Sequence, residues 1–202
     1  MKQLLTLLVV LVLVACTNEE TTGTEEKVLA KSDSTLTIKS ASLTEREQRI
    51  IDQIGIDYKT FFTVDGELAD NEHLVSSIVV FQNGDGGKEQ FQTYGDDQTF
   101  KKALHSFQLH MEDGTAYYTM GSPTGYSKGS TEMPEDLQGY GFEQLEGEVT
   151  LKSGETVYLA YVKGSSQNHM DIGGLDDYKT LPDSVKDAEY AIVAQLYITD
   201  EP

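Results

Sequence analysis

The segment YAIVAQLYIT, residues 190–199, is apolar on both faces of the β-strand that its composition predicts. Successive side chains of a strand point to opposite faces. One face would therefore carry Ile192, Leu196 and Ile198, and the other Val193 and Tyr197. Because both faces need a cover of other residues, we expect this strand at the centre of a sheet.

Short segments with a two-residue period or a β-rich composition recur along the chain and predict further strands. They cover residues 35–41, 58–64, 75–82, 88–94, 103–112, 115–120, 141–152 and 156–162. Turn-forming sequences at 83–87, 113–114 and 153–155 join three pairs of them, which predicts three hairpins. The sequence therefore predicts a mainly all-β fold, an antiparallel β-sandwich with one short N-terminal helix. A partly open β-barrel is the alternative.

The N-terminal helix is expected at residues 43–54. Apolar residues recur there at helical intervals, as Ile50, Ile51 and Ile54. Ser42 and Glu45 have the spacing of a capping box at its start, and Gly55 is suited to a helix end. The sequence therefore predicts one amphipathic helix between the first two strands.

The first 16 residues have the parts of a bacterial export signal. Lys2 precedes an apolar run from Leu4 to Ala15, whose 12 residues are fewer than the roughly 20 that a membrane-spanning helix needs. The order Leu13-Val14-Ala15-Cys16 resembles the lipobox of bacterial lipoproteins. The resemblance implies that a diacylglyceryl group is attached to the thiol of Cys16 and that the chain is cut just before this residue. It also implies a lipid-anchored protein on the extracytoplasmic face of the cell membrane.

Three regions follow from this reading of the chain. Residues 1–15 would be the signal peptide, and residues 16–34, polar and acidic, would form a flexible tether behind the lipidated cysteine. Residues 35–202 have the length of a single domain with its own core. Cys16 is the only cysteine, so after acylation no thiol remains for a disulfide or a thiolate metal site.

The net charge of −19 limits the partners of the chain. Loss of the signal peptide removes one positive charge, Lys2, and no acid, which leaves −20. A field of this sign repels nucleic acid and anionic lipid headgroups. Besides the membrane reached through the lipid anchor, the expected partners are therefore an envelope protein, a peptide or a glycan, and not nucleic acid.

Two connections are longer than turns, at residues 121–139 and 163–186. Loops of this length in compact domains are often functional. The first would enter the third hairpin where the second leaves it, so both are expected at the same end of the sandwich. Together they supply the candidate ligand-binding residues Tyr126, Tyr140, His169, Asp171, Asp176, Asp177 and Tyr178. The tyrosines offer an apolar face and a polar tip to a sugar or a peptide.

The sequence contains no motif that assigns a catalytic residue, a cofactor or a metal ligand. His105 and His110 differ by an odd number of positions, so a strand would place them on opposite faces, where they would not share a metal ion. The acids near residues 171–177 are suitable calcium ligands, although their spacing matches no calcium loop. We therefore expect non-covalent binding or an accessory role in the envelope. An extracytoplasmic hydrolase and a calcium-dependent binding module are the alternatives.

Overall fold

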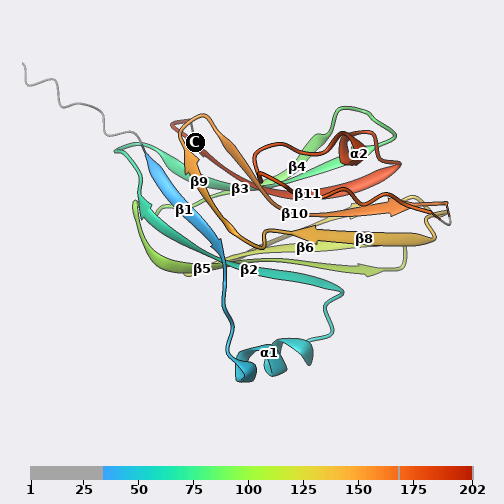
Figure 1. Ribbon diagram of the computed structural model, residues 1–202, viewed down its shortest axis with the longest axis horizontal. Coiled ribbons are helices and arrows are strands. Elements are labelled where there is room, and N and C mark those ends of the chain that lie inside the picture. Colours follow the sequence, from blue (N-terminus) through green and yellow to red (C-terminus); the bar gives the residue numbers. More distant parts are fainter. Residues whose placement is uncertain (1–33, 168, 202) are drawn as a thin grey trace, which may run out of the picture. The chain divides into compact units, whose positions relative to one another are not determined.

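The computed structural model describes residues 34–167 and 169–201, which form two antiparallel sheets and two short helices (Figure 1). The predicted signal peptide, the lipobox and Cys16 lie outside the described residues. The described strands lie in two separate sheets and not in a barrel, so the predicted all-β sandwich is confirmed.

Six strands form the first sheet. Their bounds are β1 Thr35–Ser40, β2 Tyr58–Glu67, β5 Thr99–Glu112, β6 Thr115–Ser122, β7 Gly125–Glu132 and β9 Glu148–Lys152. They lie in the spatial order β7-β6-β5-β2-β1-β9, and every neighbouring pair is antiparallel. The strands β7 and β9 are therefore the two edges of this sheet.

Five strands form the second sheet. Their bounds are β3 His73–Gln82, β4 Lys88–Tyr94, β8 Gly139–Gln144, β10 Thr156–Ser165 and β11 Tyr190–Thr199. Their order is β4-β3-β11-β10-β8. The strand β11 has the predicted bounds and the predicted central place, with antiparallel partners on both sides.

The main hydrophobic core fills the space between the sheets. It contains Leu36 and Ile38 of β1, Phe107 of β5, and Ile192 and Leu196 of β11, all of them fully buried. Burial of apolar side chains is the main favourable contribution to folding. Because the chain has no disulfide between its described residues to rely on, this core holds the two sheets together.

A second, smaller core lies on the outer face of the second sheet. It joins Ala191 and Val193 of β11 to Leu181 and Val185 of the segment 169–189, which we call the cover segment. This segment includes the short helix α2, Asp183–Lys186, and runs along the outside of β10 and β11 (Figure 1). The cover explains why β11 is apolar on both faces.

The long connection predicted at 121–139 is wrong in its first half. Residues 125–132 form the edge strand β7, which pairs along its full length with β6 after a turn at 122–125. The sequence of this strand, GYSKGSTE, lacks the apolar period that identifies a half-buried strand, and none of its residues is buried. Its hydrogen bonds to β6 form the strand instead.

The single strand predicted at 141–152 is also wrong. The chain leaves β8 at Gln144, crosses between the layers at residues 145–147, and continues as β9 in the other sheet. The turn at 153–155 exists, but it joins strands of different sheets. A crossing of this kind leaves the two-residue period almost unchanged, and tertiary pairing alone reveals it.

The predicted N-terminal helix is present as α1, Glu45–Asp52, two residues shorter at each end. Its capping box consists of Thr44 and Glu47, and the predicted box of Ser42 and Glu45 is wrong, because the chain stays extended up to Thr44. None of the residues of this helix is buried, and Figure 1 shows it standing off the first sheet. Its stability therefore comes from the cap and from its own side-chain pairs more than from packing.

Candidate functional site

A cavity of about 300 Å³ opens between the two sheets, beside the edge strands β4 and β7. Its lining combines residues of five strands with the loop 95–97 and the turn 122–125. The lining residues are Leu74, Ser76, Thr93, Tyr94, Gly95, Asp96, Asp97, Phe100, His105, Met120, Gly121, Ser122, Thr124, Gly125, Tyr126 and Ser127. We call this the interlayer pocket. Its size is at the lower end of the range for small-molecule sites.

The floor of the interlayer pocket is apolar, and its walls carry hydroxyl groups. Leu74, Phe100 and Met120 are each nearly buried and belong to the main core. Ser127 on β7 donates a hydrogen bond from Oγ to Thr93 Oγ1 on β4 at 3.4 Å, which joins the two walls. An apolar cavity with a few placed polar groups is the usual composition of a ligand site.

The imidazole of His105 is the buried polar group of this pocket. The residue is 6% exposed, and its ring stacks on Phe62, with ring centroids 5.5 Å apart and planes inclined by 21°. Its Nε2 is buried and has no hydrogen-bond partner among the described residues. A buried polar atom left unpaired costs about 1–3 kcal/mol. A ligand that pairs with it would recover this cost.

Burial lowers the pKa of His105 from 6.5 to about 4, although the negative charge of Asp97 raises it. The sign follows from desolvation, because a buried imidazole is more stable in its neutral form. At pH 7 the pocket therefore contains a neutral imidazole, with one nitrogen that accepts a hydrogen bond and one that donates.

The loop 95–98 holds two carboxylates at the rim of the pocket. Its ends are fixed by backbone hydrogen bonds, from Gly95 N to Leu74 O and from Leu68 N to Gln98 O, both 2.9 Å long. Asp96 and Asp97 lie between these bonds, are exposed, and have no hydrogen bond or ion pair within residues 34–167 and 169–201. The rim therefore presents two unpaired negative charges beside His105.

Tyr126 is the one sequence-predicted candidate that lies at the interlayer pocket. It is 70% exposed at the start of β7. The ammonium group of Lys128 lies over its ring, 5.0 Å from the centroid. His169 and Asp171 line a different, shallow cavity beside the start of the cover segment. The structure therefore does not bring Tyr126 together with these two residues, because its strand belongs to the other sheet.

The predicted meeting of the two connections is confirmed for their inner ends. Gln138 N, just before β8, donates to Ser165 O at the end of β10, at 2.9 Å. Tyr140 follows on β8, where it is half-buried against the main core, and burial raises its pKa. Its phenol is therefore part of the packing between the sheets.

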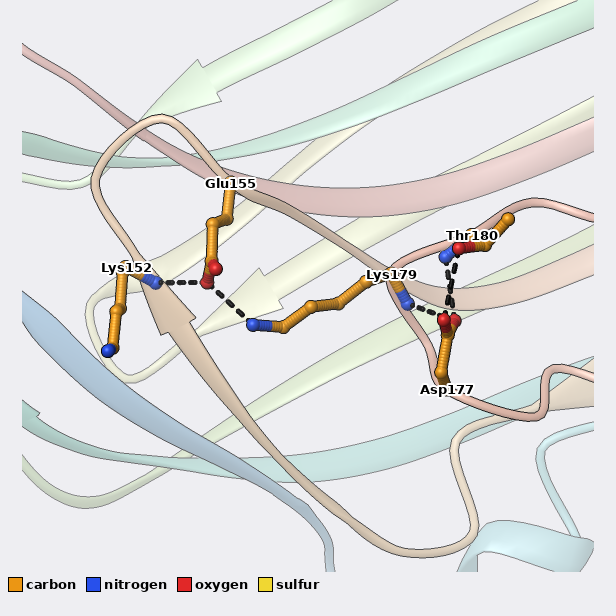
Figure 2. A network of polar contacts seen from close by, with 5 residues as sticks. All are labelled: Lys152, Glu155, Asp177, Lys179 and Thr180. Atoms are coloured by element: carbon orange, nitrogen blue, oxygen red, sulfur yellow. Dashed lines mark hydrogen bonds and ion pairs between the residues drawn. The ribbon is translucent and has the colours of Figure 1, made fainter.

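The carboxylate of Asp177 orders the cover segment. It accepts hydrogen bonds from the backbone N–H groups of Lys179 and Thr180, at 2.9 and 2.8 Å, and from the hydroxyl of Thr180 at 3.0 Å (Figure 2). These bonds hold the pKa of Asp177 below its ordinary value. The next link is Lys179, whose Nζ lies 2.6 Å from a carboxylate oxygen of Glu155 in the β9–β10 turn (Figure 2). The network ties the cover segment to the sandwich.

Tyr178 and Asp176 belong to the same segment. Tyr178 packs against both cores, and its carbonyl accepts a hydrogen bond from Tyr158 N at 2.8 Å. Its hydroxyl accepts a bond from Glu146 N at 3.3 Å. Asp176 is exposed and has no such partner in the described part of the chain. In this structure the acidic loop therefore serves mainly as a cover over β10 and β11.

Metal binding finds no support in the geometry of the described residues. Within them, no three His, Cys, Asp or Glu side chains lie close enough together to hold an ion. His105 and His110 point to opposite faces of β5, as the sequence indicates, and His110 is paired with Asp57 at 3.0 Å.

Neither described helix has the length and apolar character needed to cross a membrane.

Sequence reasoning missed the central residues of the pocket, His105 and Asp97. The alternation of β5 places His105 on the inward face with Phe107 and Leu109, and this is a signal that the sequence carries. A histidine on an apolar face indicates a buried imidazole, but the sequence does not show which cavity it lines. That depends on β4 and β7, which are not paired with β5.

Comparisons with family models, with curated proteins and with solved structures found no match to this chain.

Proposed function

We propose that this chain is a bacterial lipoprotein, held at the extracytoplasmic face of the cell membrane through Cys16, whose β-sandwich domain acts by non-covalent binding. The support for the anchor is the lipobox-like order at residues 13–16 and the short apolar run before it. A diacylglyceryl group supplies two acyl chains, and two are enough for stable anchoring, whereas one is marginal.

The unpaired Nε2 of His105 is the observation that carries the binding proposal. His105 lines a pocket of ligand size, whose other polar side chains carry hydroxyl groups and two unpaired carboxylates. A general base or acid works best with a pKa near the operating pH, whereas the pKa of His105 is about 4. The site is therefore better suited to recognition than to proton transfer. An envelope protein, a peptide or a glycan would supply the bound group.

Replacement of Cys16 tests the anchor. The full-length chain and its Cys16→Ser variant are expressed in a bacterium, and membrane and soluble fractions are compared after labelling with a radioactive fatty acid. We expect label and membrane fractionation for the parent chain and neither for the variant. Equal membrane fractionation of the two proteins would refute the anchor.

A pair of substitutions on one strand tests the pocket. Ser127 faces inward into the pocket, and Ser130 faces outward on the same strand. The His105 ring signals are followed by NMR while methyl α-D-glucoside, 1,5-diaminopentane or glutarate is added to the purified full-length chain. We expect at least one compound to shift these signals saturably in the parent chain and in Ser130→Leu, but not in Ser127→Leu. No saturable shift with any of the three would refute binding in this pocket.

A further inference from the structure

The charged residues that line the interlayer pocket are both acidic. Asp96 and Asp97 stand at its rim, and no lysine or arginine is among its lining residues. Asp97 is close enough to His105 to raise its pKa, so this carboxylate acts on the interior of the pocket as well as on solvent. An anionic ligand would meet repulsion here, and a cationic ligand would meet attraction.

The interior of the pocket is suited to an apolar stem behind a cationic head. Leu74, Phe100 and Met120 form an apolar floor. The neutral imidazole of His105 offers an acceptor nitrogen, and the hydroxyls of Thr93 and Ser127 offer oxygen acceptors. An ammonium group has three donors and no acceptor, so acceptors of this kind are what it requires.

Among the described residues, the cation that contacts a lining residue is that of Lys128. Lys128 Nζ lies over Tyr126, 5.0 Å from the ring centroid, and this is the geometry of a cation–π contact. Tyr126 and Lys128 share the outward face of β7, so this ammonium group lies outside the pocket and leaves Asp96 and Asp97 as the charged residues of its lining.

We infer that the interlayer pocket binds a primary ammonium group on a short apolar stem, with Asp97 as its counter-ion and His105 Nε2 as a buried acceptor. The inference depends on the proposed function, because it names the ligand class of the same site. The ammonium group has two possible sources, a free diamine and the lysine side chain of a peptide. A neutral sugar would leave the Asp96 and Asp97 charges without an ionic partner, which favours the amine.

The test uses a series of compounds of similar length and different charge. The series is 1,5-diaminopentane, Nα-acetyl-lysine N-methylamide, 1-pentanol, hexanoate and methyl α-D-glucoside, each added to the full-length chain at 150 mM salt while the His105 signals are followed. We expect saturable shifts with the two amines only. A tighter response to the acetylated lysine assigns the site to a peptide side chain, and a tighter response to the diamine assigns it to a free amine.

Two matched charge removals decide whether the pocket itself recognises the ammonium group. Loss of a hydrogen bond to a charged group weakens binding by about tenfold or more. We expect this loss for Asp97→Asn and none for Asp176→Asn, which removes the same charge from the exposed cover segment. Equal weakening in both variants would mean attraction by net charge only and would overturn the inference.

The remaining outcomes separate this inference from the proposed function. Saturable shifts with 1-pentanol or the glucoside as strong as those with the amines would keep the pocket as a binding site and overturn the ammonium class. If no compound shifts the His105 signals, in the parent chain or in Ser127→Leu, both the ammonium class and the proposed binding in this pocket are overturned.

Discussion

The buried imidazole of His105 should make the stability of the domain fall with acidity. In the unfolded chain its pKa is about 6.5, and in the folded domain burial lowers it to about 4. The unfolded state therefore binds the proton first as the pH falls, so the stability present above pH 6.5 is lost as the pH approaches 4. The difference amounts to about 2 kcal/mol at pH 5 and about 3 kcal/mol at pH 4.

The assay is urea unfolding at pH 7.5, 5 and 4 for the parent chain and for His105→Phe. Phenylalanine keeps a ring stacked on Phe62, and the adjoining cavity has room for its additional carbon. The carboxylates that also titrate in this range are common to both proteins, so their effects cancel in the comparison, apart from the interaction of Asp97 with His105. We expect the free energy of unfolding to fall by about 3 kcal/mol less in His105→Phe than in the parent chain between pH 7.5 and 4.

A control at the other face of the same strand completes this experiment. His110 lies on the outer face of β5, so His110→Gln leaves the buried imidazole in place and should retain the full loss of the parent chain. The reasoning is refuted if His105→Phe and the parent chain lose the same free energy. It is also refuted if NMR titration of the folded chain shows His105 taking up its proton near pH 6.5.

Three further predictions concern parts of the fold outside the pocket. Leu181→Ala removes a side chain of the cover segment that is 3% exposed in the second core. We expect a loss of about 2–5 kcal/mol in urea unfolding and faster proteolysis within residues 169–182, and unchanged values of both would contradict the second core. Gly66 has a φ of +132°, and a Cβ there would clash with the backbone oxygen of Thr35, so Gly66→Ala should cost roughly 1–3 kcal/mol or more. Gly139→Ala adds a Cβ that meets no atom within 4 Å and should cost little, and equal thermal midpoints for the two variants would refute this account. Thr44→Ala removes the cap of α1, so amide exchange in this helix should accelerate roughly fivefold, for a loss of about 1 kcal/mol. Because no residue of α1 is buried, the midpoint of global unfolding should stay unchanged. A fall in this midpoint would show that α1 supports the sandwich.

The parts of the fold that sequence reasoning found are those with a local cause. The strand β11 was predicted with its bounds and its central place, because its apolar residues occupy both faces. The turn of Asp113 and Gly114 was predicted because this dipeptide favours a positive φ, and both residues adopt one in the structure. The opposite orientation of His105 and His110 followed from the alternation of a strand.

The parts that it missed have no local signature. The edge strand β7 has no apolar period, since its hydrogen bonds to β6 hold it in place. The crossing at residues 145–147 keeps a strand-like pattern on both sides while the chain passes to the other sheet. The acidic residues near Asp177 are suitable for a ligand loop, and only the packing of Leu181 and Val185 shows that this loop covers β11.

The amino-acid sequence alone determined the β-rich composition, the turns, the central strand and the lipobox-like start, because each of these depends on neighbouring residues or on a short period. Tertiary structure alone decided which sheet each strand joins and where the candidate site lies. The interlayer pocket joins His105 of β5 to Asp97 of a loop and to the edges β4 and β7. These two edges lie in different sheets. All lining residues belong to the stretch 74–127, yet β4 and β7 meet only when the two layers pack, so the common site follows from the packing and not from the order of the residues.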